Sequence, residues 1–470
     1  MLGEGTSFQA WQDALERREL GQNPLKSIDP IHKHTRKTLY QRDVKGHTGC
    51  VNALEFSTDE NYLLSGGDDC RVFLWNAHDL LLTQDPKPCK IMDTYHTSNI
   101  FSVDISTDGK VGFSAGNDRM FYAHDLESGS GVYSLIGGGS FHRVDAHPTS
   151  DNICVATNED GRFHIVDIRA KEQTAYNVKC CAYSAVYNPQ HPELLLIATR
   201  KKGMTIRDIR KPEDDMITFN DGTHNRTKKA TFARWSPNGE SAAAVISGAG
   251  LVYCNVYSEK MIGLYDPDYV NSCTMKSCEF IGEDYILCGS DKWDIYAWKI
   301  PKNQQDVTEV AEAVKLEGHR SIVNHIRYSS ANNLIASSGV EKVIKCWSPY
   351  EMPKSYRDPV RREMSDPFAM NGDFFEHDID SVEEDLATLA QFDQYLRQAM
   401  SSAGTSLDDS SDDDELDSRS LGDILRFAVF RFNQYDDLVD EFFTDEEYAN
   451  DVQTSASSSD NEEVQEMPAD

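Results

Sequence analysis

One spacing recurs along this chain and limits what the chain can fold into. Gly46-His47 stands 28 residues before Trp75, counted from the histidine, and Gly318-His319 stands the same 28 residues before Trp347. His96 and His124 keep this spacing, with a second histidine in place of the tryptophan. A spacing that returns near both ends of a long stretch is typical of a repeated supersecondary unit rather than of a single site.

Aligning the chain on the closing residue of each unit finds seven such positions, and successive positions stand 41 to 49 residues apart. They are Trp75, His124, Val166, Arg207, Cys254, Trp298 and Trp347. Repeats of about 40–45 residues with Gly-His and a closing aromatic residue are typical of four-stranded WD-type propeller blades. The sequence therefore predicts an all-β fold, a seven-bladed WD-repeat β-propeller over residues 39–350. Its fifth blade is the least well marked, because Cys254 lacks both the tryptophan and a clear aspartate.

Local patterns agree with blades. Residues 51–56 and 322–328 alternate apolar and polar side chains, as half-buried strands do. Turn-forming residues follow the expected strands at 106–109 and 236–239. We expect residues 38–41, just ahead of the first Gly-His pair, to form the outer strand of the last blade. That pairing would close the ring and leave only short, protected edges.

Serine, histidine and aspartate recur within the units, which raises the question of a catalytic triad. A triad needs one exposed nucleophile in a pocket, whereas these residues return in several units. Buried polar groups need partners, and the spacing supplies them. We therefore expect no catalytic residues and interpret the sets as a structural hydrogen-bond network, partly repeated at His96, Ser114 and Asp118. The residues assigned to that network are His47, Ser65, Asp69, Trp75, His319, Ser337 and Trp347.

The eleven cysteines are an odd number and form neither a CxxC pair nor a Cys/His cluster at zinc spacing. Cys273 and Cys278 stand five apart, but both are expected to be strand residues, and most cysteines should be small core residues. We expect no metal and no cofactor. Without a signal sequence or an apolar run long enough to span a bilayer, the free thiols favour the nucleus or the cytoplasm.

Two flanking regions are expected on either side of the propeller. Residues 1–38 hold a short amphipathic helix at 7–20, which either packs on the propeller or docks on a partner. Residues 351–470 form an acidic, largely disordered tail: positions 371–470 carry 29 acidic and 4 basic residues, which leaves a net charge of −7 for the rest of the chain. Two tail segments, 386–400 and 421–443, have helical apolar spacing and either fold back or present an apolar face to a partner.

The charge pattern disfavours nucleic acid as a partner. Small basic groups occur, such as Arg200-Lys201-Lys202 and Lys228-Lys229, but the acidic tail would repel a polyanion. Neither a membrane partner nor an enzyme is favoured, because no apolar span and no convergent nucleophile, base or carboxylate cluster stands out. The residues alone predict a propeller that binds proteins.

The repeat region resembles the DCAF family, the WD-repeat substrate receptors of cullin-4 ubiquitin ligases. Stretches 271–278 and 318–324 are the more specific part of the resemblance, because blade architecture does not require them. The residues that carry the resemblance lie at 46–53, 65–69, 98–101, 271–278, 318–324, 338–342 and 347–350. In that family a WDxR box at the end of consecutive blades contacts the large adaptor that bridges to the cullin.

In this chain the boxes fall on Asp167 and Arg169 in the third unit and on Asp208 and Arg210 in the fourth. The resemblance implies that these four residues bind the ligase adaptor, since a planar, permanently charged arginine suits carboxylates and carbonyls across an interface. Each aspartate is expected to orient its turn or its arginine. Neither box keeps the tryptophan.

The resemblance therefore implies a non-catalytic substrate-receptor subunit of a cullin-4 RING ubiquitin ligase. Its expected partners are the ligase adaptor, cullin-4 through that adaptor, and unidentified substrate proteins. The alternative is a WD-repeat scaffold in a nuclear multiprotein complex without a ligase.

Overall fold

A computed structural model of the chain describes residues 39–93, 95–219, 229–257, 261–301, 309–310 and 312–357. The helix expected at 7–20, the segments expected at 386–400 and 421–443, and the acidic tail beyond 357 lie outside these residues. Among the described residues, no helix is long and apolar enough to cross a membrane.

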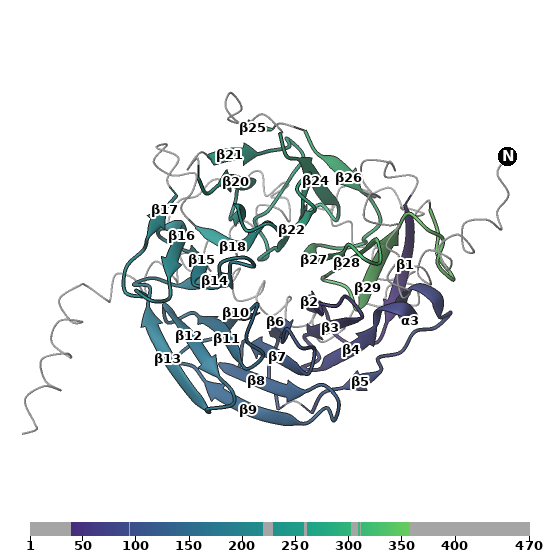
Figure 1. The fold of residues 1–470 in the computed structure, drawn as a ribbon. Helices are drawn as coiled ribbons and strands as arrows, with labels where there is room; N and C mark the ends of the chain where they lie inside the picture. The colour runs from purple at the N-terminus through teal and green to yellow at the C-terminus, as the bar shows by residue number, and fades with distance from the viewer. Residues whose placement is uncertain are drawn as a thin grey trace, which may run out of the picture. The chain divides into compact units, whose positions relative to one another are not determined.

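Seven small sheets stand around a central axis, which confirms the predicted seven-bladed propeller (Figure 1). Blades 1 to 4 follow one another along the chain, and in each the first strand is innermost. Blade 1 holds β2 (Val51–Phe56), β3 (Tyr62–Gly67), β4 (Val72–Asn76) and β5 (Lys90–Ile91). Blade 2 holds β6 (Ile100–Ile105), β7 (Val111–Gly116), β8 (Met120–Asp125) and β9 (Gly131–Ile136). Blade 3 holds β10 (Phe141–Ala146), β11 (Ile153–Asn158), β12 (Arg162–Asp167) and β13 (Glu172–Asn177). Blade 4 holds β14 (Ala182–Tyr187), β15 (Leu194–Thr199), β16 (Gly203–Asp208) and β17 (Ile217–Thr218).

The remaining three blades depart from this pattern at their outer edges. Blade 5 holds β18 (Ala230–Trp235), β19 (Ser241–Ile246), β20 (Leu251–Asn255), β21 (Met261–Leu264) and the added parallel strand β25 (Glu309–Val310). Blade 6 holds β22 (Cys278–Ile281), β23 (Tyr285–Gly289), β24 (Ile295–Lys299) and β26 (Val314–Leu316). Blade 7 holds β27 (Val323–Ser329), β28 (Leu334–Gly339), β29 (Val343–Ser348) and β1 (Tyr40–Lys45). Blade 5 thus forms although its closing residue, the fully buried Cys254, is not aromatic.

The ring closes as the sequence predicts. Strand β1, from the start of the described chain, pairs antiparallel with β29, from Tyr40 opposite Ser348 to Lys45 opposite Val343. Residues 351–357 then cover the free edge of β1. The Gln41 N–H donates to the Tyr356 carbonyl at 2.7 Å, and the Tyr356 N–H donates to the Gln41 carbonyl at 2.9 Å. The packed edge of the ring therefore runs a few residues past position 350.

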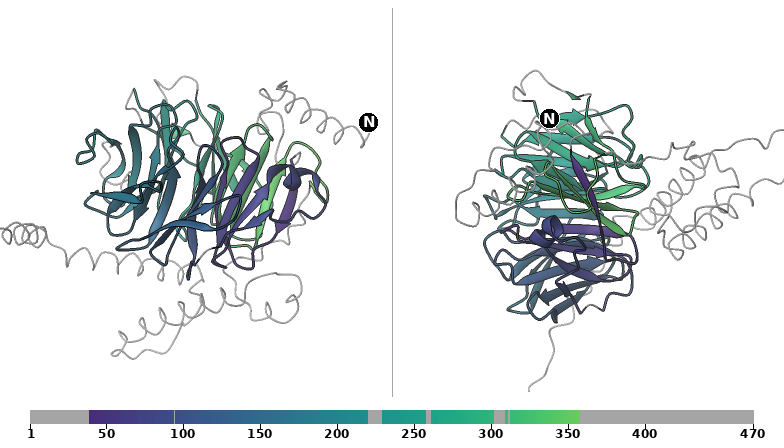
Figure 2. Two further views of the ribbon diagram at one scale, coloured as in Figure 1. Left: turned by 60° about the horizontal axis from the view of Figure 1, so that its bottom comes forward. Right: turned by 90° about the vertical axis from the view of Figure 1, so that its right-hand side faces the viewer.

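The strands of each blade run between two faces of the ring (Figure 2). We call the face at which the inner strands begin the top face, marked by Val51, Phe141 and Val323. The opposite face, at which those strands end, is the bottom face. Because neighbouring strands are antiparallel, the third strand of each blade ends at the bottom face.

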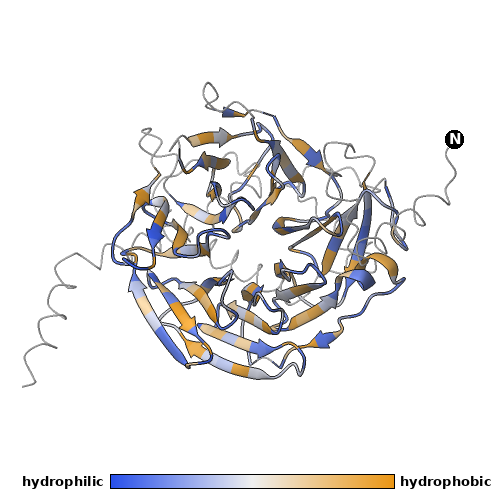
Figure 3. Cartoon of the chain, in the orientation of Figure 1, coloured by the Kyte–Doolittle hydropathy of each residue, from blue (hydrophilic) through white to orange (hydrophobic). Residues whose placement is uncertain are grey.

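Buried apolar side chains form seven clusters, and each cluster is shared between two neighbouring blades. Figure 3 shows hydrophobic and hydrophilic residues following one another along the strands. The hydrophobic ones supply these clusters. Leu64, Val72 and Ile100, for example, lie in the cluster between blades 1 and 2. Since a single blade buries its faces only against its neighbours, the ring is stable as a unit.

A hydrogen-bond chain ties the strands of blade 1 together. Trp75 Nε1 donates to Ser65 Oγ at 2.9 Å, and Ser65 Oγ lies 2.8 Å from His47 Nε2. His47 Nδ1 lies 3.0 Å from the Asp69 carboxylate, which also accepts the Thr48 N–H. With Nδ1 donating to the carboxylate, Nε2 is left to accept the serine proton.

Blades 7 and 2 contain the same chain with substitutions. In blade 7, Trp347 Nε1 lies 2.8 Å from Ser337 Oγ, His319 Nε2 lies 2.6 Å from the same oxygen, and Glu341 replaces the aspartate. In blade 2, His124 occupies the tryptophan position and lies 2.9 Å from Ser114 Oγ. Burial lowers the pKa of His124 to about 3, so its ring is neutral and can supply the N–H that tryptophan supplies elsewhere.

The cysteine expectation needs one correction. Cys278 begins strand β22, but Cys273 lies in the loop before it, where its N–H donates to Asp291 Oδ2 at 3.0 Å. This aspartate fixes the loop by accepting the Ser272 N–H as well, so the strand starts later than the sequence pattern suggests. Six of the eleven cysteines are buried, and all eleven are free thiols.

Candidate functional site

The two Asp-x-Arg turns lie on neighbouring blades at the same face. Asp167 is the last residue of β12 in blade 3, and Asp208 is the last residue of β16 in blade 4. Both are third strands, so both turns lie on the bottom face. The structure thus brings together two segments that stand 41 residues apart in the sequence.

Each aspartate fixes the backbone of the turn that follows it. Asp167 Oδ1 accepts the N–H groups of Arg169 and Ala170, both at 3.0 Å. Asp208 Oδ1 accepts the Arg210 N–H at 2.9 Å. An aspartate that binds the N–H two residues later forms an Asx-turn, so both arginines leave the blade from the same local geometry.

The two arginine side chains differ in their partners. Arg210 Nε lies 2.8 Å from Asp208 Oδ1, and Arg210 Nη2 lies 2.6 Å from Asp208 Oδ2. This two-point pairing, with the backbone N–H of Arg210, lowers the pKa of Asp208 to about 2. Arg169 is exposed, and within the described part of the chain its guanidinium has no hydrogen bond or ion pair. The guanidinium of Arg210 is therefore held in place by Asp208, whereas the guanidinium of Arg169 can donate hydrogen bonds to a binding partner.

The residues at the missing tryptophan positions are both structural. Val166 is fully buried in the cluster between blades 2 and 3. Arg207 is only 2% exposed: its Nε lies 2.5 Å from Asp215 Oδ1, and its Nη1 donates to the Pro212 carbonyl at 2.9 Å. A buried guanidinium needs such partners, so Arg207 holds the outer turn of blade 4 and leaves Arg210 to face outward.

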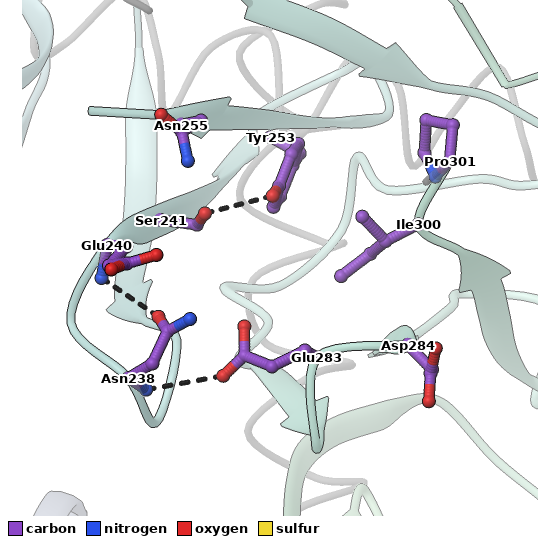
Figure 4. A pocket seen from close by; sticks show the side chains of 9 residues that line it. All are labelled: Asn238, Glu240, Ser241, Tyr253, Asn255, Glu283, Asp284, Ile300 and Pro301. Atoms are coloured by element: carbon purple, nitrogen blue, oxygen red, sulfur yellow. Dashed lines mark hydrogen bonds between the residues drawn. The ribbon is translucent and has the colours of Figure 1, made fainter. Parts of the chain in front are cut away.

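A second feature of the bottom face is a small hollow between blades 5 and 6, shown in Figure 4. It encloses about 200 Å³ and carries the acidic residues Glu240, Glu283 and Asp284 at its rim. Burial and these acidic neighbours raise the pKa of Glu283, whose carboxylate accepts the Asn238 N–H at 3.2 Å. The hollow has acidic walls, so it suits a basic or neutral polar group.

The central channel contains a set of charged residues that the repeat alignment did not single out. We call it the channel ring. Each member lies on an inner strand and pairs with the third residue of the next strand in its blade. The members are Glu55, Asp104, Asp145, Arg234, Glu279 and Arg327. A charged residue near the end of each of these inner strands, at the fifth position in five of the six, was the signal that could have found it.

Glu55 is the centre of this ring. Its carboxylate lies 2.6 Å from Arg327 Nε, 3.3 Å from Arg234 Nη2 and 3.6 Å from Arg143 Nη2. Burial alone would raise the pKa of Glu55, but the three guanidinium groups outweigh burial and lower the pKa to about 2. These contacts join blades 1, 3, 5 and 7, so the arrangement acts as a clamp on the ring.

Two acids of the channel ring also cap the free inner edges of the next blades. Asp104 Oδ2 accepts the Ala146 N–H at 2.7 Å, and Asp145 Oδ2 accepts the Tyr187 N–H at 2.8 Å. The inner strand of a propeller blade has unpaired backbone groups that need partners. We therefore assign the channel ring to the architecture rather than to the binding of a ligand.

Comparison with known proteins agrees with the repeat structure. The WD domain, G-beta repeat family matches residues 38–76, which hold β1 and most of blade 1, and residues 312–348, which hold β26 of blade 6 and the inner three strands of blade 7. DDB1- and CUL4-associated factor 5 of Mus musculus and of Homo sapiens are each 34% identical over 438 residues, which covers 87% of this chain and 46% of each relative. WD repeat protein iqw1 of Schizosaccharomyces pombe is 31% identical over 176 residues, 33% of this chain and 20% of that protein. The chain spans just under half the length of the two factor 5 proteins.

Proposed function

The chain is a WD-repeat propeller protein related over most of its length to DDB1- and CUL4-associated factor 5, and on that premise we propose that it is a substrate-receptor subunit of a cullin-4 RING ubiquitin ligase. The relative's name states an association with DDB1 and CUL4, and we propose the same association for this chain. The aligned share of 87% exceeds the share of the chain that forms the propeller, so the relationship rests on more than the repeats.

The observation that carries this proposal is the pair of turns on the bottom face. Asp167 and Asp208 fix two neighbouring Asx-turns, and each turn presents an exposed arginine. Arginine is enriched among the residues that dominate binding free energy at interfaces, because its planar group binds carboxylates and carbonyls with fixed geometry. We assign Asp167, Arg169, Asp208 and Arg210 to the binding of the ligase adaptor.

The role we propose is proximity rather than catalysis. The bottom face would bind the adaptor, and through it cullin-4, while another surface holds the protein to be modified. Holding both partners on one rigid ring raises the local concentration of substrate lysines near the transfer enzyme. The same proposal places the chain in the nucleus or the cytoplasm, where its eleven cysteines would stay reduced.

The test is affinity purification of the tagged full-length chain from cells, with partners identified by mass spectrometry. Arg169→Ala/Arg210→Ala is compared with the wild type and with Arg71→Ala/Arg119→Ala. The second pair removes the same charge from exposed arginines in top-face turns. We expect adaptor and cullin-4 with the wild type and with the control pair, and at least a tenfold loss with the bottom-face pair.

Two results would contradict the proposal. Equal recovery of the adaptor with both double variants would remove the assignment to the Asp-x-Arg turns. No recovery of the adaptor or cullin-4 with the wild-type chain would favour the alternative, a WD-repeat scaffold in a nuclear complex without a ligase.

A further inference from the structure

Blade 5 ends its third strand in a turn that is equivalent to the two Asp-x-Arg turns of the bottom face. Asn255 is the last residue of β20, and its Oδ1 accepts the Tyr257 N–H at 3.1 Å. A hydrogen bond from the N–H two residues later defines the Asx-turn that Asp167 and Asp208 form in blades 3 and 4. Tyr257 therefore occupies in blade 5 the position that an arginine occupies in each of the two preceding blades.

The middle residue of each turn fixes the backbone a second time. The Val256 N–H donates to the Glu240 carbonyl at 3.0 Å, and the Val256 side chain packs against the apolar cluster between blades 4 and 5. Ile168 and Ile209 make the same kinds of contact in blades 3 and 4, where their N–H groups lie 2.9 and 2.8 Å from backbone carbonyls. Three consecutive blades thus present the residue that follows from a backbone held at two points.

The side chain of Tyr257 contributes little to the core of the propeller. It is 74% exposed, and among the described residues its ring has no aromatic contact and its hydroxyl has no hydrogen bond. The tyrosine at the equivalent position of blade 7, Tyr350, is instead partly buried and packs against the cluster between blades 7 and 1. A partner that covers the Tyr257 ring would bury apolar surface that the fold leaves in water.

The neighbouring blades do not continue this series of turns. In blade 2 the equivalent residue is Glu127, which is exposed and opposite in charge to the two arginines. In blade 6 it is Pro301, which has no N–H, and the strand before it ends in Lys299, whose side chain accepts no hydrogen bond. The series therefore covers blades 3, 4 and 5.

We propose that Tyr257 is the third contact of the adaptor-binding surface, beside Arg169 and Arg210; this inference rests on the receptor role proposed above. The adaptor would present carboxylates or carbonyls to the arginines and a flat apolar or peptide surface to the ring. Tyrosine and arginine are both enriched among the residues that dominate binding free energy at interfaces. A tyrosine ring also loses little entropy on binding, because it has only two side-chain torsions to fix.

The proposed contact continues toward blade 6. Asn255, which holds the Tyr257 turn, also lines the hollow between blades 5 and 6 (Figure 4). An adaptor segment that covers Tyr257 would therefore lie at the edge of this hollow. The hollow leaves room beside the turn for a side chain of the adaptor.

The test measures the affinity of purified adaptor for the full chain. Tyr257→Ala is compared with the wild type and with Tyr95→Ala. Tyr95 is 76% exposed and precedes His96, which lies 2.9 Å from Asp118 in the top-face turn of blade 2, so it is a matched tyrosine on the opposite face. We expect Tyr257→Ala to weaken binding about tenfold and Tyr95→Ala to bind as the wild type does. Tyr257→Phe keeps the ring and should retain most of the affinity.

The effect of salt separates the ring from the two arginines. Salt screens exposed charges, but it does not weaken the contact of an aromatic ring in the same way. The loss of affinity for Arg169→Ala/Arg210→Ala should therefore shrink at high salt, whereas the loss for Tyr257→Ala should stay the same. Thermal unfolding of Tyr257→Ala should match that of the wild type, because the ring is exposed.

The outcomes distinguish this inference from the receptor role. If the wild type binds adaptor and Tyr257→Ala binds equally well, the contact is wrong and the receptor role stands. An equal loss for Tyr95→Ala, a loss for Tyr257→Phe as large as that for Tyr257→Ala, or a lower unfolding midpoint for Tyr257→Ala would each overturn the contact as well. A wild-type chain that binds no adaptor would remove the receptor role itself, and this inference with it.

Discussion

Arg327 donates a hydrogen bond from Nε to Glu55 Oε2 across 2.6 Å, and the two residues stand 272 positions apart in the sequence. Arg327 belongs to the innermost strand of blade 7 and Glu55 to that of blade 1. The same two blades are also connected at the outer rim. There β1 pairs with β29 as the outermost strand of blade 7, and the chain then continues from β1 into blade 1. The ring is thus closed at its inner edge by an ion pair and at its outer edge by a strand.

Glu55→Gln should destabilise the ring. The amide keeps the shape of the side chain but leaves Arg327, Arg234 and Arg143 without their shared carboxylate. Removing one partner of a buried ion pair typically costs about 3–5 kcal/mol, because the remaining charge is not compensated. Urea unfolding followed by intrinsic fluorescence measures the loss. Glu172→Gln on the exposed outer strand β13 is the control, and equal free energies of unfolding for the two variants would show that the clamp contributes nothing.

Asp104→Asn should stabilise the chain at higher pH. Burial, followed by the charges of Glu55 and Asp145, raises the pKa of Asp104 in the folded state above its usual range. The folded state therefore holds a proton that the unfolded state releases above about pH 4. The stability from that proton is present below the unfolded pKa and is lost as the pH rises through the folded pKa.

The measurement for Asp104 is the urea midpoint at pH 5 and at pH 8. Asparagine is uncharged at both values and can still accept the Ala146 N–H. The gain over the wild type should therefore be larger at pH 8, on the order of 2 kcal/mol. Asp108→Asn in an exposed turn serves as the control. A gain that is the same at both pH values would mean that Asp104 does not titrate in this range.

Two adjacent serines of β28 should respond oppositely to alanine. Ser337 Oγ lies 2.6 Å from His319 Nε2 and 2.8 Å from Trp347 Nε1, whereas the buried Ser338 Oγ has no hydrogen-bond partner among the described residues. Ser337→Ala leaves two buried ring nitrogens unpaired, which costs about 1–3 kcal/mol. Ser338→Ala removes only an unsatisfied hydroxyl and should be neutral or stabilising. Differential scanning calorimetry compares the two, and a similar loss for both would contradict the hydrogen-bond chain.

Most of the fold could be predicted because the repeat marks each blade. The equivalents of His47, Ser65 and Trp75 recur in another blade at the same spacing, which is typical of WD-type blades. Residues 38–41 lie where a strand that closes the ring was expected. Blade 5 was harder to mark because its closing residue, Cys254, is not aromatic and has no clear aspartate beside it, and its outer edge could not be predicted at all. Its outer strand β21 pairs with β25, which comes from the connection inside blade 6, and no pattern within one repeat reports such a pairing.

The candidate interface was less predictable than the fold. The spacing of Asp208 and Arg210 predicts that they lie at a blade end. It does not predict that the two side chains bind each other. The repeat alignment placed Arg207 at the closing position of the blade and Arg210 in the box, but it did not predict the carboxylate that pairs with the buried Arg207. That partner, Asp215, comes from the turn that follows the strand, outside the repeat pattern. The channel ring was missed for the same reason, since its ion pairs join residues from different repeats.

The two bottom-face arginines should contribute unequally to adaptor binding. Arg210 is already paired with Asp208 through two hydrogen bonds, so a partner must replace or share that carboxylate. Arg169 has no side-chain partner in the described part of the chain, so its contact with the adaptor would be a net gain. We therefore expect Arg169→Ala to weaken binding of purified adaptor about tenfold or more, and Arg210→Ala to weaken it less. Arg169→Lys should recover only part of the loss, because an ammonium lacks the planar fork. Surface plasmon resonance on the immobilised full chain measures all three variants. A larger loss for Arg210→Ala than for Arg169→Ala would contradict this ranking, and would mean that Asp208 holds Arg210 in its binding position.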